Sequence, residues 1–542
     1  MTLAVVVLLL AMSAHAQAAA SDYRVRLFWL HPPSELTLTP RGSVHCNGSP
    51  IAAPLLLRAS ADSVQSSLPS CRGQVVKIEG TLTLKLPNGV AGFFHPLEIR
   101  SRRGRLLLTG TIPLEQYVVS VLLGESSVFT SDEALKAMAV AVRTYAVHYR
   151  GRHRTEGFDL CDTTHCQDLR IAEAPTPRLT LAVEATEGEL LWYGGAPAAT
   201  YYHRHCGGST EDVESVWPDR HAPYLKRQTD TFCLSRGRAP WRSEVSAGSL
   251  GSGPPLRILS RTASGRVAEL DWNGQRITAT RFHQRIGELF GWTLLRSNHY
   301  DVTRRGEHMI FQGFGAGHGV GLCQAGAEER GKAGSTYRQI LAFYYPGTKP
   351  GINAQGFAWV QGRGELVDVA AESRHTAADL AALADRALQE AQRRTGLPLT
   401  FRPILRSYPS VAGFRDATGQ PGWVAASTRG TVVRMQPVAL LRSLGTLEVA
   451  LLHESLHLLI ESNAHPSLPE WFREGLALCL SDSDVARHKR GRTATKAEAS
   501  HRATHRQAKE RVERLLQRFG RQRVLRWVHS GLPGEALHPS GE

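Results

Sequence analysis

The period of the hydrophobic pattern changes twice before Pro350, and this limits the fold more than any other feature of the chain. From Tyr23 to about Gly110, apolar and polar residues alternate between Gly, Pro and Asn breaks, which is typical of short strands and hairpins. Between Pro113 and Arg150, apolar residues recur every three or four positions, which predicts two amphipathic helices, the second opened by Ser131 as N-cap. Strand-like, loop-rich sequence then resumes to about Pro350. This order predicts a mixed, strand-rich α+β domain with helices in its middle.

A second, smaller domain is predicted beyond this point. Residues 351–368 form a Gly- and Gln-containing connection, and Ala377–Arg394 is an alanine-rich helical segment. We place the boundary near residue 365, within this connection. A chain of 542 residues is long enough for roughly two to four folding units. The predicted parts are a leader at 1–16, a domain at 17–350, a linker at 351–371 and a domain at 372–535.

The N-terminal segment predicts export. An apolar run of about a dozen residues precedes Ala14-His15-Ala16, a small-residue pattern that predicts signal-peptide cleavage after Ala16. The run is shorter than the ~20 residues of a bilayer span, so no integral membrane segment is expected after cleavage. We therefore expect the mature protein in the periplasm or cell envelope.

Export affects how the eight cysteines and the net charge of +15 are interpreted. Because disulfides persist in oxidising compartments, Cys46 with Cys71 and Cys206 with Cys233 are candidate pairs. The positive charge implies attraction to polyanions, which in a cell envelope are wall polymers and lipid head groups. Nucleic acid is not an expected partner, because the chain lacks an aromatic-basic recognition motif.

Several motifs of the first domain share one order and spacing with a known family. They are Ile112–Val121 leading to Gly124-Glu125, then Glu133–Ala146, Cys161–Gln167, Gly313–Ala327 and Tyr344–Thr348. Over roughly residues 24 to 350 the chain resembles the stage II sporulation protein D family, the amidase-enhancer-like lytic transglycosylases. The resemblance implies cleavage of peptidoglycan glycan strands between N-acetylmuramic acid and N-acetylglucosamine, with a 1,6-anhydro product.

In this family pattern Glu125 occupies the catalytic position, at the end of a predicted helix. One carboxyl group suffices for the chemistry, because it can donate a proton to the leaving oxygen and then accept one from the sugar's own 6-hydroxyl. Leu122, Leu123 and Val128 flank Glu125, and partial burial among them is expected to raise its pKa.

A second interpretation of the first domain is a non-catalytic wall-binding protein that activates an N-acetylmuramoyl-L-alanine amidase, which would make a wall amidase its partner. The presence of Glu125 favours an enzyme, because a binding module needs no carboxyl group at that position. The glycine-rich segment Gly313–Ala327 lacks the Gly-Lys-Ser/Thr ending of a phosphate-binding loop. His318 and Gln324 within it are candidate sugar contacts, with a purely structural turn as the alternative.

A compact set of soft donors suggests a metal in the same domain. Cys161, His165 and Cys166 share one short loop, and His153 lies eight residues upstream of Cys161. These donors suit tetrahedral zinc, and the resemblance supports zinc at the cysteine and histidine positions. A disulfide between Cys161 and Cys166 is the alternative.

The second domain carries the pattern His453-Glu454-Ser455-Leu456-His457 within the apolar helical segment Leu447–Ile460. One helical turn separates the two histidines, so both can bind one zinc, with Glu454 beside it to activate water. Glu474 follows seventeen residues after His457, and Glu470 is an alternative ligand.

Together with Leu468–Ala477, this pattern resembles the thermolysin-like zincins, specifically the small peptidase-MA-like domains. The resemblance implies a small α+β zincin-like domain with Glu474 as third zinc ligand, Glu454 as general base, and zinc-assisted peptide hydrolysis. A wall peptide, another protein, or an inactive domain remain open.

Overall fold

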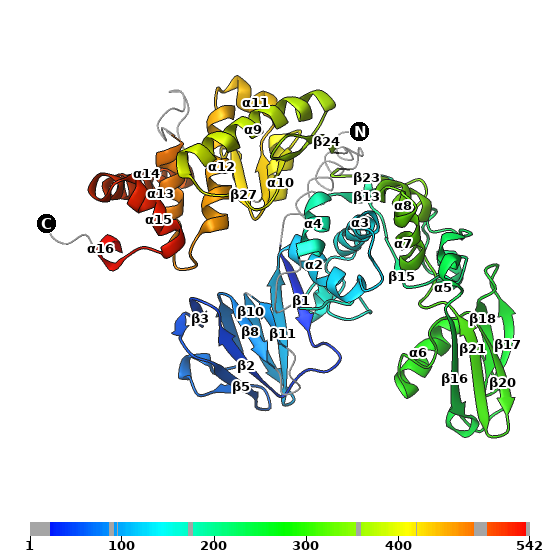
Figure 1. Cartoon of the computed structure of the whole chain (residues 1–542). Coiled ribbons are helices and arrows are strands. Elements are labelled where there is room, and N and C mark those ends of the chain that lie inside the picture. The colour runs from blue at the N-terminus through cyan, green and yellow to red at the C-terminus, as the bar shows by residue number, and fades with distance from the viewer. Residues whose placement is uncertain are drawn as a thin grey trace, which may run out of the picture. The chain divides into compact units, whose positions relative to one another are not determined.

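The computed structural model describes residues 22–85, 91–94, 96–171, 177–353, 359–418, 420–481 and 496–537 (Figure 1). The predicted leader at 1–16 lies outside these residues. Within the described part, no helix is both long and apolar enough to span a bilayer. The chain divides into two compact units, Met1–Phe357 and Ala358–Glu542, which together confirm a mixed α+β architecture.

The first unit begins with the predicted run of short strands, which form two sheets. Their orders are β12-β1-β11-β10-β7-β3-β4 and β6-β5-β2-β8-β9. Along β2 and β10, buried residues alternate with more exposed ones, so each strand turns one face to a shared core. The strands are β1 (Tyr23–Leu27), β2 (Glu35–Pro40), β3 (Val44–Cys46), β4 (Ser49–Ile51), β5 (Leu55–Ala59), β6 (Val64–Ser66), β7 (Val75–Glu79), β8 (Leu82–Lys85), β9 (Ala91–Phe94), β10 (Leu97–Arg102), β11 (Arg105–Ile112) and β12 (Leu160–Cys161).

One predicted disulfide is confirmed and the other is wrong. Cys46 at the end of β3 is bonded to Cys71 in the short helix η1 (Pro69–Cys71). Cys206 and Cys233 are both free thiols. The reason is that Cys323, ninety residues beyond Cys233, brings a third sulfur to within 3.6 Å of the Cys233 Sγ, so the three thiols form one cluster instead of a bonded pair.

The two predicted helices follow directly after β11. They are α2 (Leu114–Glu125) and α3 (Asp132–His148), and the Ser131 side chain caps α3 by accepting a hydrogen bond from the Ala134 amide. Nearly every residue of α3 is buried, including Arg143, whose guanidinium forms an ion pair of 2.6 Å with Glu115 of α2. This contact fixes the two helices against each other.

Several of the remaining elements of the first unit pack against α3, among them α4, α7 and α8. The elements are η2 (Arg154–Glu156), α4 (Pro177–Ala185), β13 (Leu190–Tyr193), β14 (Ala196–Pro197), β15 (Tyr202–His203), α5 (Val213–Val216), η3 (Phe232–Arg236), β22 (Leu322–Cys323), α7 (Gln324–Lys332), α8 (Tyr337–Tyr344) and β23 (Lys349–Gly351). Strands β15 and β22 pair in parallel, with His203 opposite Cys323. This pairing brings residues far apart in sequence to the start of α7.

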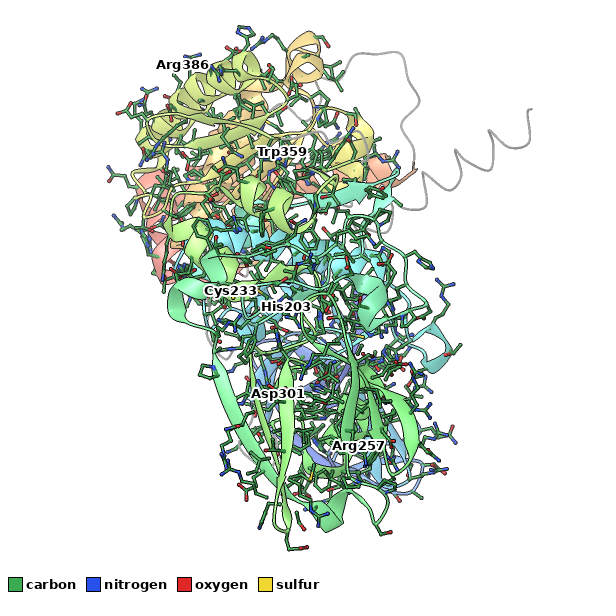
Figure 2. All side chains as sticks on the ribbon, turned by 90° about the vertical axis from the view of Figure 1, so that its right-hand side faces the viewer. His203, Cys233, Arg257, Asp301, Trp359 and Arg386 are labelled. Carbon is green, nitrogen blue, oxygen red and sulfur yellow. A yellow bond between two sulfur atoms is a disulfide. The ribbon has the colours of Figure 1, made fainter. Side chains whose placement is uncertain are left out.

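Between η3 and β22 the chain forms a smaller lobe with its own core around Trp241, Phe282 and Phe311. Two three-stranded sheets and a helix make up this lobe, in which Figure 2 labels Arg257 on β17 and Asp301 on β20. The elements are β16 (Pro240–Ser246), η4 (Ala247–Leu250), β17 (Arg257–Arg261), β18 (Val267–Trp272), β19 (Gln275–Thr278), α6 (Ala279–Phe290), β20 (Tyr300–Arg305) and β21 (His308–Phe314).

The second unit has a five-stranded sheet of order β24-β25-β26-β28-β27, against which α9 packs. Its helix α9 contains the predicted alanine-rich segment, and α12 contains the predicted apolar helix with both histidines. The elements are β24 (Val360–Arg363), β25 (Asp368–Ala371), α9 (Arg374–Thr395), β26 (Ile404–Ser407), α10 (Val411–Thr418), β27 (Ala426–Arg429), β28 (Val432–Met435), α11 (Val438–Ser443), α12 (Leu447–Asn463), α13 (Glu470–Leu480), α14 (Lys496–Phe519), α15 (Arg521–Ser530) and α16 (Gly534–Leu537).

Candidate functional site

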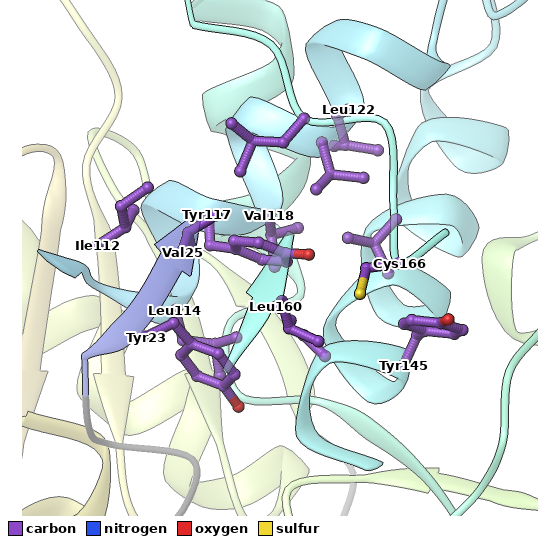
Figure 3. Close-up of a cluster of buried hydrophobic side chains, with 14 of the residues drawn as sticks. Tyr23, Val25, Ile112, Leu114, Tyr117, Val118, Leu122, Tyr145, Leu160 and Cys166 are labelled. Atoms are coloured by element: carbon purple, nitrogen blue, oxygen red, sulfur yellow. The ribbon is translucent and has the colours of Figure 1, made fainter. Parts of the chain in front are cut away.

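Helix α2 carries Glu125 as its last residue and is anchored by its apolar face. Figure 3 shows Tyr117, Val118 and Leu122 of α2 in one buried cluster with Val25 of β1 and Leu160 of β12. These side chains recur at the three- and four-residue spacing of the sequence pattern. Their burial against the sheet fixes the position of the C-terminal end of α2. Glu125 is thereby held at a fixed place beside the core.

The Glu125 carboxylate is partly buried and accepts a hydrogen bond from the Gln324 side chain. The Gln324 Nε2 lies 2.9 Å from the Glu125 Oε2, and Gln324 is the first residue of α7. Burial raises the pKa of Glu125 above its ordinary value, and the hydrogen bond from Gln324 opposes this shift. The structure thus brings together two of the residues selected from the sequence, in a setting where a carboxyl group holds its proton to higher pH.

Gly124 allows the loop after β12 to approach Glu125. A Cβ at Gly124 would lie 2.2 Å from the Asp168 carbonyl oxygen, so no larger residue fits without a shift of that backbone. The Asp168 backbone also donates a hydrogen bond that lowers the pKa of Glu125, while the Asp168 charge raises it. The close contact therefore positions one of the groups that determine the acidity of Glu125.

We predict that Gly124→Ala destabilises the first unit and reduces the activity that depends on Glu125. Overpacking against backbone typically costs about 1–3 kcal/mol, which exceeds the roughly 1 kcal/mol that alanine contributes in a helix. Denaturant unfolding of the full chain measures the loss. Gly248→Ala is the matched control, because a Cβ there meets nothing closer than 3.8 Å. Equal stability of the two variants would contradict the prediction.

A series of buried hydrogen bonds near Glu125 was not identified from the sequence. The Tyr117 hydroxyl donates to the Gln167 Oε1 at 3.0 Å, and the Gln167 Nε2 donates to the Tyr202 hydroxyl at 3.0 Å. Tyr202 lies close enough to Glu125 for the carboxylate charge to raise the pKa of the phenol, after the larger effect of burial. Gln167 is the last residue of the motif that begins at Cys161, and its place in this motif was the one indication in the sequence that it belongs to the site.

A groove lies near Glu125, within the first unit. Its cavity volume is about 490 Å³, and its lining residues are Val128, Arg204, His205, Ala239, Pro240, Trp292, Thr293, Arg296, Gly315, Ala316 and Ala325. Glu125 is not one of the lining residues, but two of them are close to it: the Arg204 charge lowers the pKa of Glu125, and Ala325 directly follows Gln324, which donates a hydrogen bond to Glu125. Trp292 is 58% exposed, which leaves an indole face for a ligand.

His318 occupies a different environment from that of Gln324. Its ring packs against Tyr201, His203 and Trp217, and its Nδ1 accepts a hydrogen bond from the Val320 amide at 3.0 Å. Burial lowers the pKa of His318 to about 4, so the ring is neutral at pH 7. Of the two candidate residues in the glycine-rich segment, Gln324 therefore contacts Glu125, whereas His318 packs among aromatic rings.

The four predicted donors of the first domain converge. Cys161, Cys166, His153 and His165 each offer one atom within 4.8 Å of the others. The Cys166 Sγ lies 3.5 Å from the His153 Nε2, and the Cys161 Sγ lies 3.8 Å from the His165 Nδ1. Both cysteines are free thiols. On its far side the His153 Nδ1 lies 2.6 Å from Glu156, the carboxylate–histidine arrangement that orients zinc-binding imidazoles.

In the second unit, His453 and His457 project from one face of α12 toward Glu474 of α13. The His457 Nε2 lies 3.2 Å from both the His453 Nε2 and the Glu474 Oε2. Burial favours a raised pKa for Glu474, but its hydrogen bond with His457 and the nearby histidine charges outweigh burial and lower that pKa to about 2. Glu474 Oε1 is buried and makes no hydrogen bond among the described residues, but it lies within ion-pair distance of the His453 Nε2, at 3.7 Å, and of a third imidazole.

Glu454 lies beside these three residues but outside their cluster. Its Oε2 accepts a hydrogen bond of 2.6 Å from the Thr428 hydroxyl on β27, and burial raises its pKa.

Two further features of the second unit were not identified from the sequence. The His505 Nδ1 on α14 lies 3.3 Å from the Glu474 Oε1, and Gly475 lets the α14 backbone approach, since its Cβ would lie 2.3 Å from the Ala508 oxygen.

Fold and site together define an α+β protein that presents a half-buried carboxyl group near a groove, with three clusters of metal-type donors among the described residues. A family profile described as Stage II sporulation protein matches residues 102–193, which include α2, α3 and the donor loop, the segment that carries Cys161, His165 and Cys166. An uncharacterised protein of Brachyspira hyodysenteriae is 30% identical over 254 residues, covering 45% of this chain and 67% of that protein. The chain therefore belongs to the Stage II sporulation protein family, and the matched profile lies in its first unit.

Two named relatives come from Bacillus subtilis (strain 168). Its stage II sporulation protein D is 28% identical over 266 residues, covering 44% of this chain and 74% of the relative. Its amidase enhancer is 29% identical over 284 residues, covering 42% of this chain and 39% of the relative. Each similarity thus covers less than half of this chain.

Proposed function

We propose that the first unit is a lytic transglycosylase that cleaves peptidoglycan between N-acetylmuramic acid and N-acetylglucosamine and leaves a 1,6-anhydro end. The observation that carries the proposal is Glu125, a partly buried carboxyl group of raised pKa near a groove. Membership of the Stage II sporulation protein family supports a role at the cell wall. We propose an exported protein of the periplasm or cell envelope, without nucleic acid as a partner.

Glu125 performs both proton transfers in this proposal. Its acid form donates a proton to the glycosidic oxygen as the bond from that oxygen to C1 of the muramic acid breaks. The resulting carboxylate then accepts the proton of the same sugar's 6-hydroxyl while O6 bonds to C1. No water is consumed, so a second catalytic carboxylate is unnecessary. The hydrogen bond from Gln324 stabilises the carboxylate form between the two steps.

The groove offers groups that suit a wall glycan. Arg204 and Arg296 line it, and guanidinium groups form charge-assisted hydrogen bonds with carboxylates such as those of stem peptides. The exposed Trp292 supplies an apolar face on which a sugar ring can pack. In this arrangement the strand lies in the groove and presents one glycosidic oxygen to Glu125.

We predict that Gln324→Ala moves the basic limb of the pH–rate profile to higher pH. The Gln324 hydrogen bond lowers the pKa of Glu125, so its removal raises that pKa, and the proton-donating form persists further into the alkaline range. The limb is measured from glycan release by the full chain between acidic and alkaline pH. The exposed Gln312→Ala is the control and should leave the limb in place. A basic limb at unchanged or lower pH in Gln324→Ala would refute the assignment.

A second function, activation of a wall amidase without catalysis, is favoured by the similarity to the amidase enhancer. In that case the groove binds the wall and an N-acetylmuramoyl-L-alanine amidase is the partner. The two functions differ in what they require of Glu125. If the first unit is an activator, the Glu125→Gln variant still stimulates the amidase, and the chain releases no glycan ends when the amidase is absent. If it is a transglycosylase, the wild-type chain releases glycan ends without the amidase.

We propose that His153, Cys161, His165 and Cys166 bind a structural zinc ion. The fit rests on two thiols and two imidazoles within reach of one centre, and on Glu156 hydrogen-bonded to the outer nitrogen of His153. Bound zinc would hold the donor loop, which continues into Gln167 and Asp168 beside Glu125. The ion would have no part in the proton transfers.

Cys161→Ser is predicted to lower the zinc content of the purified full chain by about one equivalent, because a hydroxyl is a poor replacement for a thiolate ligand. Elemental analysis against protein concentration measures the content. Cys479→Ser, in α13, is the control and should leave it unchanged. A Cys161–Cys166 disulfide in non-reducing peptide mapping, or an unaltered zinc content in folded Cys161→Ser, would exclude zinc at this cluster.

We propose that the second unit is a zincin-like domain with metallopeptidase activity. His453, His457 and Glu474 fit a zinc ion as three ligands, because their donor atoms lie within 4.8 Å of one another and the Glu474 oxygens lie 3.7 Å from the His453 Nε2 and 3.2 Å from the His457 Nε2. Bound zinc would supply Lewis-acid polarisation of the scissile carbonyl and of the attacking water. A wall stem peptide is one candidate substrate.

The chain's own groups then provide the proton chemistry. Glu454 is buried beside the histidines, and its raised pKa makes its carboxylate a stronger base for the proton of the attacking water. Thr428 holds this carboxylate in place. Glu470 is exposed at the start of α13, whereas Glu474 lies one turn further on, facing the histidines, which favours Glu474 as the third ligand.

A further inference from the structure

Three cysteines that no part of the proposed function uses meet in the interior of the first unit. Cys206, Cys233 and Cys323 are each at most 1% exposed, and Asp230 is fully buried beside them. Each offers one atom within 4.8 Å of the others, and Figure 2 labels Cys233. They come from three separate segments: the loop after β15, the helix η3 with the residues before it, and the end of β22.

We propose that these four residues form a second structural zinc site, independent of the site at Cys161 and of the proposed enzymatic function. The distances match a tetrahedral ion. Sulfurs bound to one zinc at about 2.3 Å are about 3.8 Å apart, and the Cys233 and Cys323 Sγ atoms lie 3.6 Å apart. The Cys206 Sγ lies 3.7 Å from the Asp230 Oδ2, close to the spacing expected of a sulfur and an oxygen on the same ion.

The surroundings of the Cys323 sulfur fit a thiolate. Its Sγ accepts hydrogen bonds from two backbone amides, that of Cys206 at 3.2 Å and that of Gly326 at 3.4 Å. Such N–H donors stabilise negative charge on a metal-bound sulfur. A disulfide would instead use two of the three cysteines and leave the third as a buried, unmatched thiol.

Asp230 is positioned by groups outside the cluster, as carboxylate ligands usually are. The Tyr344 hydroxyl donates to its Oδ2 at 2.6 Å, and the Arg330 Nη2 donates to its Oδ1 at 3.2 Å. Gly326 makes room for this contact, since a Cβ there would lie 2.1 Å from the Asp230 Oδ2. His205 borders the cluster, because its Nδ1 and Nε2 lie 3.4 and 3.5 Å from the Cys233 Sγ, but it is not one of the four residues whose donor atoms all lie within 4.8 Å of one another, and its Nδ1 accepts a hydrogen bond from the Gly207 amide.

The charges around the cluster also balance with a divalent cation in place. Three thiolates and one carboxylate carry four negative charges, of which zinc neutralises two. The other two are matched by Arg330, paired with Asp230, and by the buried Arg266, whose Nη2 donates to the Cys206 carbonyl at 2.6 Å. Without a cation, two of the four ionised groups would be uncompensated in the interior, which is strongly unfavourable.

The site would determine the position of Gln324. Cys323 is the N-cap of α7, and Gln324, the next residue, donates the hydrogen bond to Glu125. Zinc bound to Cys323 would therefore fix the start of α7 to η3 and to the loop after β15. It acts as a positioning element, because none of its ligands contacts the carboxyl group that we propose as catalytic.

The test is a comparison of zinc content and thiol state in the full chain, purified with zinc and without reductant. Cys233→Ser should lose about one equivalent of zinc, Cys161→Ser should lose its own, and the double variant should lose both. Cys479→Ser is the control and should lose none. These readouts do not involve glycan cleavage, so failure of the proposed function would leave them unchanged.

Peptide mapping of the wild-type chain gives a second readout that does not depend on a variant that folds. After denaturation with an alkylating reagent and no reductant, Cys206, Cys233 and Cys323 should all carry the label. A disulfide joining any two of them would overturn the proposal. So would a folded Cys233→Ser variant, by circular dichroism, with the zinc content of the parent.

Discussion

Replacing Glu125 by glutamine is expected to lower the release of glycan fragments by about 100- to 10,000-fold, the usual contribution of general acid–base assistance. The amide matches the carboxyl group in shape, so the hydrogen-bonding distance to Gln324 can be kept while the transferable proton is lost. Burial raises the pKa of Glu125, so the wild-type residue is available as an acid at higher pH than a surface carboxyl group. The variant removes this function without removing the groove.

The measurement is the rate of soluble fragment release from purified peptidoglycan, together with wall binding by co-sedimentation. Binding should be retained, because Arg204, Trp292 and Arg296 are unchanged. Glu288→Gln, on the exposed surface of α6, is the matched control and should release fragments at the parent rate. Unchanged release by Glu125→Gln would mean that another group donates the proton.

Glu454→Gln is expected to retain zinc in the second unit and to lower peptide cleavage by about 100- to 10,000-fold. Glu454 lies beside the two histidines but is hydrogen-bonded to Thr428, so its loss removes the base and leaves the proposed ligands intact. Because burial raises the pKa of Glu454, wild-type cleavage should also fall as the pH drops through that raised value, where the carboxylate becomes protonated.

Labelled casein and wall stem peptides are suitable probes, with zinc content measured on the same samples. Glu470→Gln is the control for the alternative ligand and should leave both zinc and cleavage unchanged, whereas Glu474→Gln should lose zinc. Retained zinc in Glu474→Gln with loss in Glu470→Gln would contradict the ligand assignment. Full cleavage by Glu454→Gln would refute its role as base.

The parts of the fold that local patterns determine could be predicted from the sequence. Alternation from Tyr23 to Gly110 predicted the strands β1–β11, and the change of period after Pro113 predicted α2 and α3, including the Ser131 cap. Burial of one face per element follows directly from such patterns. The pairing of Cys46 with Cys71, twenty-five residues apart, was also within reach of local reasoning.

Contacts between distant segments could not be predicted in the same way. The error at Cys206 and Cys233 arose because the third sulfur, Cys323, reaches the cluster only through the parallel pairing of β15 with β22. Nor does any local pattern indicate that Trp292 borders the groove or that His505 approaches Glu474. The bond between Gln324 and Glu125 joins residues 199 positions apart, so even this selected pair became a contact only in three dimensions.

Cleavage of glycan strands by intramolecular attack of the 6-hydroxyl is tested most directly by the ends of the products that the first unit releases. Purified peptidoglycan is digested with the full chain, and the released fragments are analysed by mass spectrometry before and after borohydride reduction. Intramolecular attack should give 1,6-anhydro-muramic acid ends that reduction does not alter, and these ends should be lost with Glu125→Gln. New reducing ends would show that water attacks, and they would contradict intramolecular attack.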